Sequence, residues 1–147
     1  MNRWDKYFHN ICIAVASKSP CLSRQIGAIL VRDKSIVATG YNGPARNYPH
    51  CEGECPRKLK GYKSGEGLVE CPAAHAEGNC IANAARLGVC TVGTTLYMNS
   101  IVPCKDCMIL LVNAGITEVV IEKYEWYHEM SADISIYGGI KIREFEL

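Results

Sequence analysis

The chain has 147 residues, of which 48% are hydrophobic and 21% charged, a length and composition typical of one compact domain over residues 1–147. Its formal net charge is only +1, which argues against a surface for nucleic acid or an anionic membrane and favours a small-molecule partner. Because the sequence has neither a secretion signal nor an apolar run long enough to span a membrane, its nine cysteines are expected to be reduced thiols in a cytoplasmic protein.

The first part of the chain predicts one helix, one hairpin and a long loop. Apolar residues recur at helical spacing over residues 3–18, and Pro20 ends that helix. Two β-branched runs between residues 25 and 43 flank the polar turn Arg32-Asp33-Lys34 and predict a β-hairpin. Residues 42–71 show no apolar period, and a loop of this length in a compact domain is usually functional or internally tied down.

The second part alternates between helices and strands. We expect helices over residues 73–87, 105–114 and 125–137, and strands over residues 94–99, 117–122 and 139–147. Gly88 and Gly115 are suitable C-terminal stops for the first two helices. Together with the hairpin, this order predicts an α/β fold, a three-layer α/β/α sandwich around a mixed five-stranded sheet.

Three residues form a candidate ligand set for a catalytic zinc ion. His75, Cys104 and Cys107 offer one nitrogen and two sulfur ligands, and three protein ligands with one open position are typical of catalytic zinc. Pro72 and Pro103 precede them, so both groups are expected at helix starts, where free N–H groups and the helix dipole stabilise thiolates.

Glu77 follows His75 by two residues, and this spacing needs an irregular backbone. Two residues of regular helix rotate a side chain by roughly 200°, so the pair can share a site only if His75 lies in an irregular first turn. Glu77 then lies near the metal as a proton shuttle for an activated water. A structural zinc knot or a nucleic-acid-binding zinc finger is the alternative, but it would leave Glu77 without a role.

The other cysteines suggest a second site. Cys21, Cys51, Cys55 and Cys71 lie in or beside the long loop and could bind a structural zinc, with His50 replacing one of them. Several unconnected thiols are the alternative. The remaining residues of this kind are expected to pack as small buried hydrophobes (Cys12, Cys80 and Cys90) or at the surface or in the core (His9 and His128).

The spacing H-x-E followed by P-C-x-x-C is the signature of zinc-dependent nucleobase deaminases. With SPCLSRQIGAIL, GYNGPARNYPHC and C-x3-HAE in the same order, residues 1–125 resemble the deoxycytidylate deaminases, especially the compact microbial and phage type. The resemblance implies a cytidine-deaminase-like fold and hydrolysis of dCMP to dUMP and ammonia for thymidylate synthesis. In that reaction a zinc-activated water attacks C4 with Glu77 as proton shuttle. It also favours the second, structural zinc.

The resemblance implies how the nucleotide is held. Ser23 and Arg24 correspond to contacts with the 5′-phosphate, and Asn42 to a contact with a deoxyribose hydroxyl; a solvated Arg24 and a turn role for Asn42 are the alternatives. The Ala76 N–H is suited to the pyrimidine carbonyl, and Tyr124 either closes the pocket or packs as an ordinary aromatic. The sequence departs from the family at Asn99, which replaces a common threonine in a loop one residue longer than usual.

The resemblance also implies a homo-oligomer, in many relatives a hexamer, that is activated by dCTP and inhibited by dTTP with Mg²⁺. Two other classes of function stay open on sequence alone. One is deamination of a nucleoside, a free base or a tRNA base, and the other is a zinc-stabilised interaction module without activity.

Overall fold

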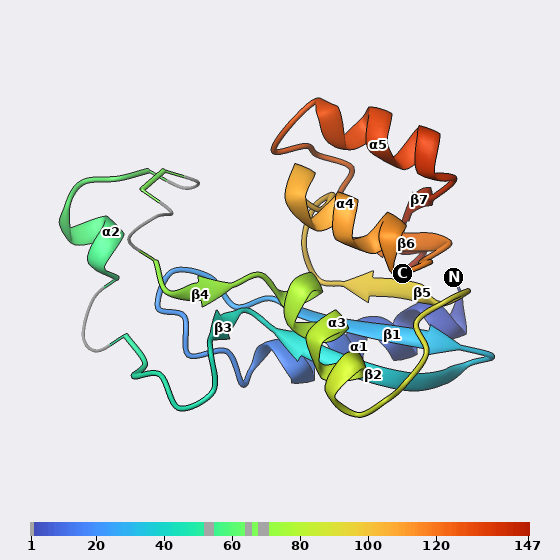
Figure 1. Ribbon diagram of the computed structural model, residues 1–147, viewed down its shortest axis with the longest axis horizontal. Coiled ribbons are helices and arrows are strands. Elements are labelled where there is room, and N and C mark those ends of the chain that lie inside the picture. The colour runs from blue at the N-terminus through green and yellow to red at the C-terminus, as the bar shows by residue number, and fades with distance from the viewer. Residues whose placement is uncertain (1, 52–54, 64–65, 68–70) are drawn as a thin grey trace.

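A single five-stranded sheet organises the chain in the computed structural model, which describes residues 2–51, 55–63, 66–67 and 71–147 (Figure 1). The strands are β1 (Gly27–Arg32), β2 (Ser35–Tyr41), β5 (Thr95–Met98), β6 (Glu118–Ile121) and β7 (Lys141–Glu144). Their order is β2-β1-β5-β6-β7. Strand β1 is antiparallel to β2 and β5, whereas β5, β6 and β7 run parallel, so the predicted mixed sheet is confirmed.

Helices cover both faces of this sheet. The helices are α1 (Arg3–Ala16), α2 (Pro56–Leu59), α3 (Ala76–Arg86), α4 (Lys105–Asn113) and α5 (Met130–Gly138). Helix α1 packs on one face through Phe8 and Cys12, while α3 and α4 pack on the other through residues such as Cys80 and Leu111. Helix α5 lies against α4. The predicted three-layer α/β/α sandwich is therefore confirmed.

Two glycines let the helices approach the sheet closely. A Cβ on Gly27 would lie 2.3 Å from the Cys12 carbonyl oxygen of α1, and one on Gly40 would lie 2.3 Å from the Cys80 nitrogen of α3. Real Cβ atoms do not approach backbone this closely, so only glycine is compatible with these contacts. Gly40 thereby fixes the position of α3, whose N-terminus carries the candidate site.

Several predicted element boundaries were wrong. The helix expected from residue 73 begins at Ala76, because Ala73–Ala74 form the short strand β4 that pairs with β3 (Gly43–Pro44). The helix expected from residue 125 begins at Met130, whose N–H is accepted by His128 Nδ1 at 3.0 Å. The first helix ends two residues early, at Ala16, and the last strand covers only Lys141–Glu144. The long loop contains α2, which has no apolar period.

A buried ion pair joins the first helix to the last strand. Arg143 donates from Nη1 and Nη2 to the two carboxylate oxygens of Asp5 at 2.6 and 2.9 Å, and the Glu146 N–H adds a third hydrogen bond at 2.9 Å. Asp5 is only 1% exposed. Burial alone would raise the pKa of Asp5, but the hydrogen bonds and the charge of Arg143 outweigh it and lower the pKa below its ordinary value.

Arg143→Ala is expected to lower the free energy of unfolding by about 3 kcal/mol, because it leaves the Asp5 carboxylate buried without its cation. Urea unfolding at neutral pH measures this loss. Lys141→Ala on the same strand is the control, since Lys141 is exposed and its Nζ lies 3.9 Å from Glu118; we expect a change below about 0.5 kcal/mol.

The same ion pair predicts a pH dependence. Because the folded-state pKa of Asp5 is lowered, its carboxylate stabilises the fold above the unfolded value of about 3.9 and loses this effect as the pH falls through the folded-state pKa. Asp5→Asn should therefore be less stable than the original chain at neutral pH, and the difference should shrink at about pH 3. An undiminished difference at acid pH would contradict this assignment.

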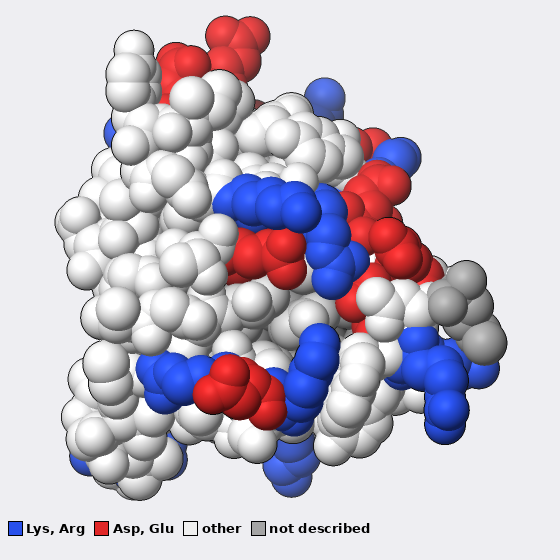
Figure 2. All heavy atoms as spheres, turned by 90° about the vertical axis from the view of Figure 1, so that its right-hand side faces the viewer, with Lys and Arg blue, Asp and Glu red and all other residues white. Residues whose placement is uncertain are grey.

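Figure 2, seen from the right-hand side of Figure 1, shows acidic and basic side chains mixed on one face beside a broad area without charged residues. On this face no patch of a single sign of charge dominates. Within the described residues, the helices are all too short or too polar to cross a membrane.

Candidate functional site

Two helix starts present the predicted metal ligands. His75 is the N-cap of α3 and Cys104 the N-cap of α4, and both have extended backbones, with φ, ψ of −71°, 155° and −64°, 168°. Neither side chain accepts a capping hydrogen bond from its own helix. Both are therefore free to turn toward a common point, and Cys107 reaches it from the first turn of α4.

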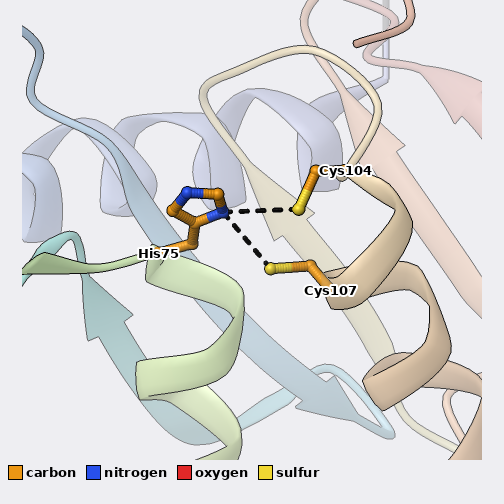
Figure 3. A group of neighbouring side chains, drawn as sticks. All are labelled: His75, Cys104 and Cys107. Atoms are coloured by element: carbon orange, nitrogen blue, oxygen red, sulfur yellow. Dashed lines mark hydrogen bonds between the residues drawn. The ribbon is translucent and has the colours of Figure 1, made fainter. Parts of the chain in front are cut away.

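The three donor atoms have the spacing of a zinc site. His75 Nδ1 lies 3.5 Å from Cys104 Sγ and 3.4 Å from Cys107 Sγ (Figure 3), and all three atoms lie within 4.8 Å of one another. Tetrahedral zinc with Zn–S of about 2.3 Å and Zn–N of about 2.0 Å holds N and S about 3.6 Å apart. The residues therefore fit a zinc ion. In the described part of the chain, no other group of three or more such side chains is close enough to share an ion.

The site is open on one side and closed on the other. His75 is exposed, whereas Cys107 is buried. A hydrogen bond with Cys107, assisted by His75, lowers the pKa of Cys104 to about 4, and the same hydrogen bond together with burial raises the pKa of Cys107. Cys104 thus presents a thiolate, the form that binds a metal ion.

Glu77 lies beside this cluster, in the first turn of α3. Glu77 is only 4% exposed, and its carboxyl group interacts electrostatically with the side chains of His75 and Cys107. Burial is the main reason that the pKa of Glu77 is raised. Because His75 is extended and precedes the helix, the rotation of a regular helix does not apply to this pair, and the shared site stays a prediction.

The Arg24 guanidinium is linked to the loop that precedes Cys104. Its Nη2 donates to Ser100 Oγ at 2.8 Å, and its Nη1 donates to the Tyr127 hydroxyl. Ser100 and Tyr127 were not singled out from the sequence, since they come from distant segments without a motif. Ser23 lines the same hollow as Arg24, so these two residues are brought together.

Two asparagines hold the backbone of this segment. Asn42 Oδ1 accepts from the Ile26 N–H at 2.9 Å, and its Nδ2 donates to the Arg24 carbonyl at 2.8 Å. Asn99 Oδ1 accepts from the Gly27 N–H at 2.6 Å. The sequence showed Asn99 only as a departure from the family, and this contact was not predicted from it. Both amides therefore position the segment that carries Arg24.

The other two predicted substrate contacts lie in different surroundings. Ala76 is buried at the first position of α3, where the helix itself supplies no acceptor for the backbone N–H. Tyr124 is 48% exposed and packs edge to face on Trp126, with ring centroids 5.1 Å apart. Among the described residues, its side chain makes no hydrogen bond or ring contact with His75, Cys104 or Cys107, and its role in the pocket stays a prediction.

The four loop cysteines converge on one small cavity. It has a volume of about 30 Å³, and its walls include Cys21, Cys51, Cys55 and Cys71. Burial and the charges of the other three cysteines raise the pKa of Cys51, whereas the N–H groups of Lys58 and Arg57 lower the pKa of Cys55. The four sulfur atoms are not close enough as they stand to share one ion. His50 is exposed and does not line the cavity.

Predictions for the remaining cysteines and histidines have mixed outcomes. Cys12 and Cys80 are buried as expected, but Cys90 is exposed, so that prediction was wrong. Burial raises the pKa of Cys80 to about 12, which keeps this thiol protonated. His9 does have a partner, because its Nε2 lies 2.7 Å from a carboxylate oxygen of Glu122.

Comparisons with known proteins agree with this geometry. The chain is 36% identical over 143 residues to the deoxycytidylate deaminase of Saccharomyces cerevisiae, covering 97% of this chain and 45% of the yeast protein. It is 37% identical over 125 residues to the deoxycytidylate deaminase of Mycobacterium phage D29, covering 82% of this chain and 94% of the phage protein. The chain thus spans less than half the length of the yeast relative and nearly the whole of the phage relative.

A solved structure has the same fold. The dCMP deaminase of cyanophage S-TIM5 in complex with dCMP and dUMP superimposes with a TM-score of 0.78 over 98% of both chains, at 22% identity. Residues 2–123 match the family described as the cytidine and deoxycytidylate deaminase zinc-binding region. With the cluster of His75, Cys104 and Cys107 at its helix starts, the chain belongs to this family of deaminases.

Proposed function

We propose that the chain hydrolyses dCMP to dUMP and ammonia and supplies dUMP for thymidylate synthesis. The observation that carries the proposal is the buried carboxyl group of Glu77 in contact with a cluster of one nitrogen and two sulfur donors. The named activity of the yeast and phage relatives supports it. Residues 1–147 are proposed to act as one deaminase domain.

His75, Cys104 and Cys107 would hold the zinc ion. When bound there, zinc acts as a Lewis acid and lowers the pKa of a water molecule to about 7. Glu77 accepts one proton from the attacking water and passes it to the ring nitrogen, then takes the second proton from the oxygen now on C4 and passes it to the departing amine. The balance is one water consumed for each ammonia released, and C4 exchanges its amine for a carbonyl oxygen.

The environment of Glu77 suits both directions of proton transfer. Burial raises its pKa, which brings the carboxyl group closer to neutral pH, where an acid–base catalyst both accepts and donates efficiently. The neighbouring Ala76 N–H points out of the first turn of α3 and is proposed to donate to the pyrimidine carbonyl. The exposed side of His75 leaves room for a base to enter.

The substrate class is proposed from the segment of Arg24. Ser23 and Arg24 are assigned to the 5′-phosphate, and Asn42 to a deoxyribose hydroxyl. The Asn42 amide makes one hydrogen bond through each of its two polar atoms, and an amide has further donor and acceptor capacity. Tyr124 is retained as a candidate for closing the pocket.

An assay of ammonia release tests this proposal against its alternatives. We expect dCMP to be preferred over deoxycytidine, cytidine, cytosine and dCTP, and tRNA to remain unchanged. Equal turnover of cytidine and dCMP, or turnover of tRNA alone, would identify another deaminase specificity. Zinc binding without turnover of any aminated base would favour the interaction module instead.

We further propose a structural zinc among Cys21, Cys51, Cys55 and Cys71. The four thiols line one cavity of about 30 Å³, which exceeds the roughly 10–15 Å³ that a single water requires. An ion would have to draw the sulfur atoms together and would tie α2 to the body of the protein.

If the structural zinc is present, elemental analysis should find two zinc ions per chain. In the variant Cys51→Ser it should find one. His50→Ala should retain two ions if all four ligands are thiols. A single ion in the original chain would remove the structural site and leave the catalytic site untouched.

An oligomer is proposed on the basis of exposed apolar side chains. Helices α4 and α5 expose Leu110, Ile136 and Tyr137 to 46%, 74% and 92%, and such residues commonly lie at protein interfaces. Light scattering measures the subunit number, with a hexamer expected from the resemblance. Regulation by dCTP, and by dTTP with Mg²⁺, is proposed from the same resemblance to the deoxycytidylate deaminases.

The nine free thiols favour a reducing compartment such as the cytoplasm.

A further inference from the structure

A basic hollow lies apart from the metal ligands. Its volume is about 240 Å³. The residues that line it are Ser23, Arg24, Arg57, Lys58, Tyr62 and Lys63. Four of these six residues are cations and none is a carboxylate, although the whole chain has a net charge of only +1. Charge of one sign concentrated in a hollow attracts anions.

The first wall of the hollow is tied to the candidate active site. Arg24 contacts Ser100 and Tyr127, and Ser100 belongs to the loop that leads into Cys104. A guanidinium has five N–H donors, so these two contacts leave donors for an anion. The wall is also rigid, because Asn42 and Asn99 hold its backbone.

The second wall comes from α2 and the turn that follows it. Arg57 donates from Nη1 to the Glu66 carbonyl at 2.8 Å, and the Tyr62 N–H donates to the Arg57 carbonyl at 3.0 Å. The buried Arg57 Nε has no acceptor among the described residues. These contacts of Arg57 and Tyr62 hold α2 and the turn together as one wall of the hollow.

The position of α2 connects the hollow to the cysteine cavity. Arg57 lines both spaces, and Cys55 immediately precedes α2. In Figure 1 the α2 segment lies at the same end of the sheet as the N-termini of α3 and α4. The long loop therefore brings cations to the end of the molecule where the metal ligands are located.

We propose that α2 and its following turn form the second wall of the 5′-phosphate site, with Arg57, Lys58 and Lys63 facing Ser23 and Arg24 across the bound phosphate. This inference rests on the proposed function and extends its phosphate contacts to a segment without a sequence motif. A phosphate monoester carries close to two negative charges at neutral pH. Arginine binds such a group through paired N–H donors, and lysine adds point charges.

The hollow fits a single phosphate group better than a nucleic acid. Its cations face one hollow instead of following an extended stripe. Nucleic acids need several phosphate contacts spread along a surface. The site therefore selects nucleotides over nucleosides.

The test uses the paired variant Lys58→Gln/Lys63→Gln, because both lysines are exposed. Arg57 is left unchanged, because it also lines the cysteine cavity. We expect the KM for dCMP to rise about tenfold with kcat little changed, the pattern of lost substrate binding. Turnover of deoxycytidine, which has no phosphate, should be unchanged. Lys18→Gln is the matched control, since it removes the same charge from an exposed lysine outside the hollow.

Direct binding separates this inference from the proposed function. Calorimetry in a Glu77→Gln background compares the Kd of dCMP and of deoxycytidine with and without the two lysine substitutions. A tenfold weaker Kd for dCMP alone supports the phosphate site, even if the original chain proves inactive. An unchanged Kd for dCMP or an equal loss for deoxycytidine would overturn it.

Discussion

Glu77→Gln is expected to lower kcat for dCMP by about a thousandfold while the zinc content stays the same. Glutamine keeps the size of the side chain but neither accepts the water proton nor returns it, and general acid–base catalysis commonly contributes ~10²–10⁴-fold. The side chain is buried and contacts Cys107, so its shape is retained where it packs against the metal ligands.

Steady-state kinetics and elemental analysis on the same sample measure this effect. Glu129→Gln is the control, because Glu129 is an exposed carboxylate at the start of α5, and we expect its kinetics to be unchanged. A Glu77→Gln variant with normal turnover would exclude Glu77 as the proton shuttle. A variant that loses its zinc would instead assign Glu77 to the coordination of the ion.

Cys104→Ser is expected to abolish turnover by removing the catalytic ion. The change replaces a soft thiolate by a hydroxyl, which is a much poorer zinc ligand. In the original chain a lowered pKa of about 4 keeps Cys104 as a thiolate at neutral pH. We therefore expect one fewer zinc ion per chain and a loss of activity beyond the thousandfold expected for Glu77→Gln.

Cys90→Ser is the matched control for this loss, because Cys90 is an exposed thiol outside the cluster. Its zinc content and turnover should equal those of the original chain. Circular dichroism should show that Cys104→Ser remains folded, since the sheet and its helices are packed through a hydrophobic core that does not include Cys104. Full activity in the Cys104→Ser variant would contradict the assigned ligand set.

The layers of the fold could be predicted because their signals are local. Apolar residues at helical spacing indicate α1, and β-branched runs on either side of Asp33 and Lys34 indicate the hairpin. Both turn residues have positive φ, 51° and 63°, as a tight two-residue hairpin turn requires. The ligand pattern was equally local, because Cys104 and Cys107 lie three residues apart at a helix start.

Other features depend on contacts between distant segments. Strand β4 is two residues long and forms only because Ala73–Ala74 meet Gly43–Pro44, so no periodicity could indicate it. The predicted helix start at residue 125 failed because Trp126 packs against the core from an irregular segment. The apolar pattern there reflects tertiary packing, not a helix face.

The basic hollow illustrates the same limit at the candidate site. Arg24 meets Ser100 and Tyr127 across 76 and 103 residues of sequence. Arg57 belongs to a four-residue helix in a loop that looked irregular. Their charges were visible in the sequence, but their convergence on one space follows from the fold alone.

We propose that an ion held by His75, Cys104 and Cys107 and the carboxylate of Glu77 together make this chain a hydrolytic deaminase. The most direct measurement is the amount of dUMP and ammonia formed from dCMP by the zinc-loaded chain, with bound zinc counted on the same sample. We predict equal amounts of both products and many turnovers per chain. Failure to convert dCMP with the ion bound at this cluster would contradict this proposal.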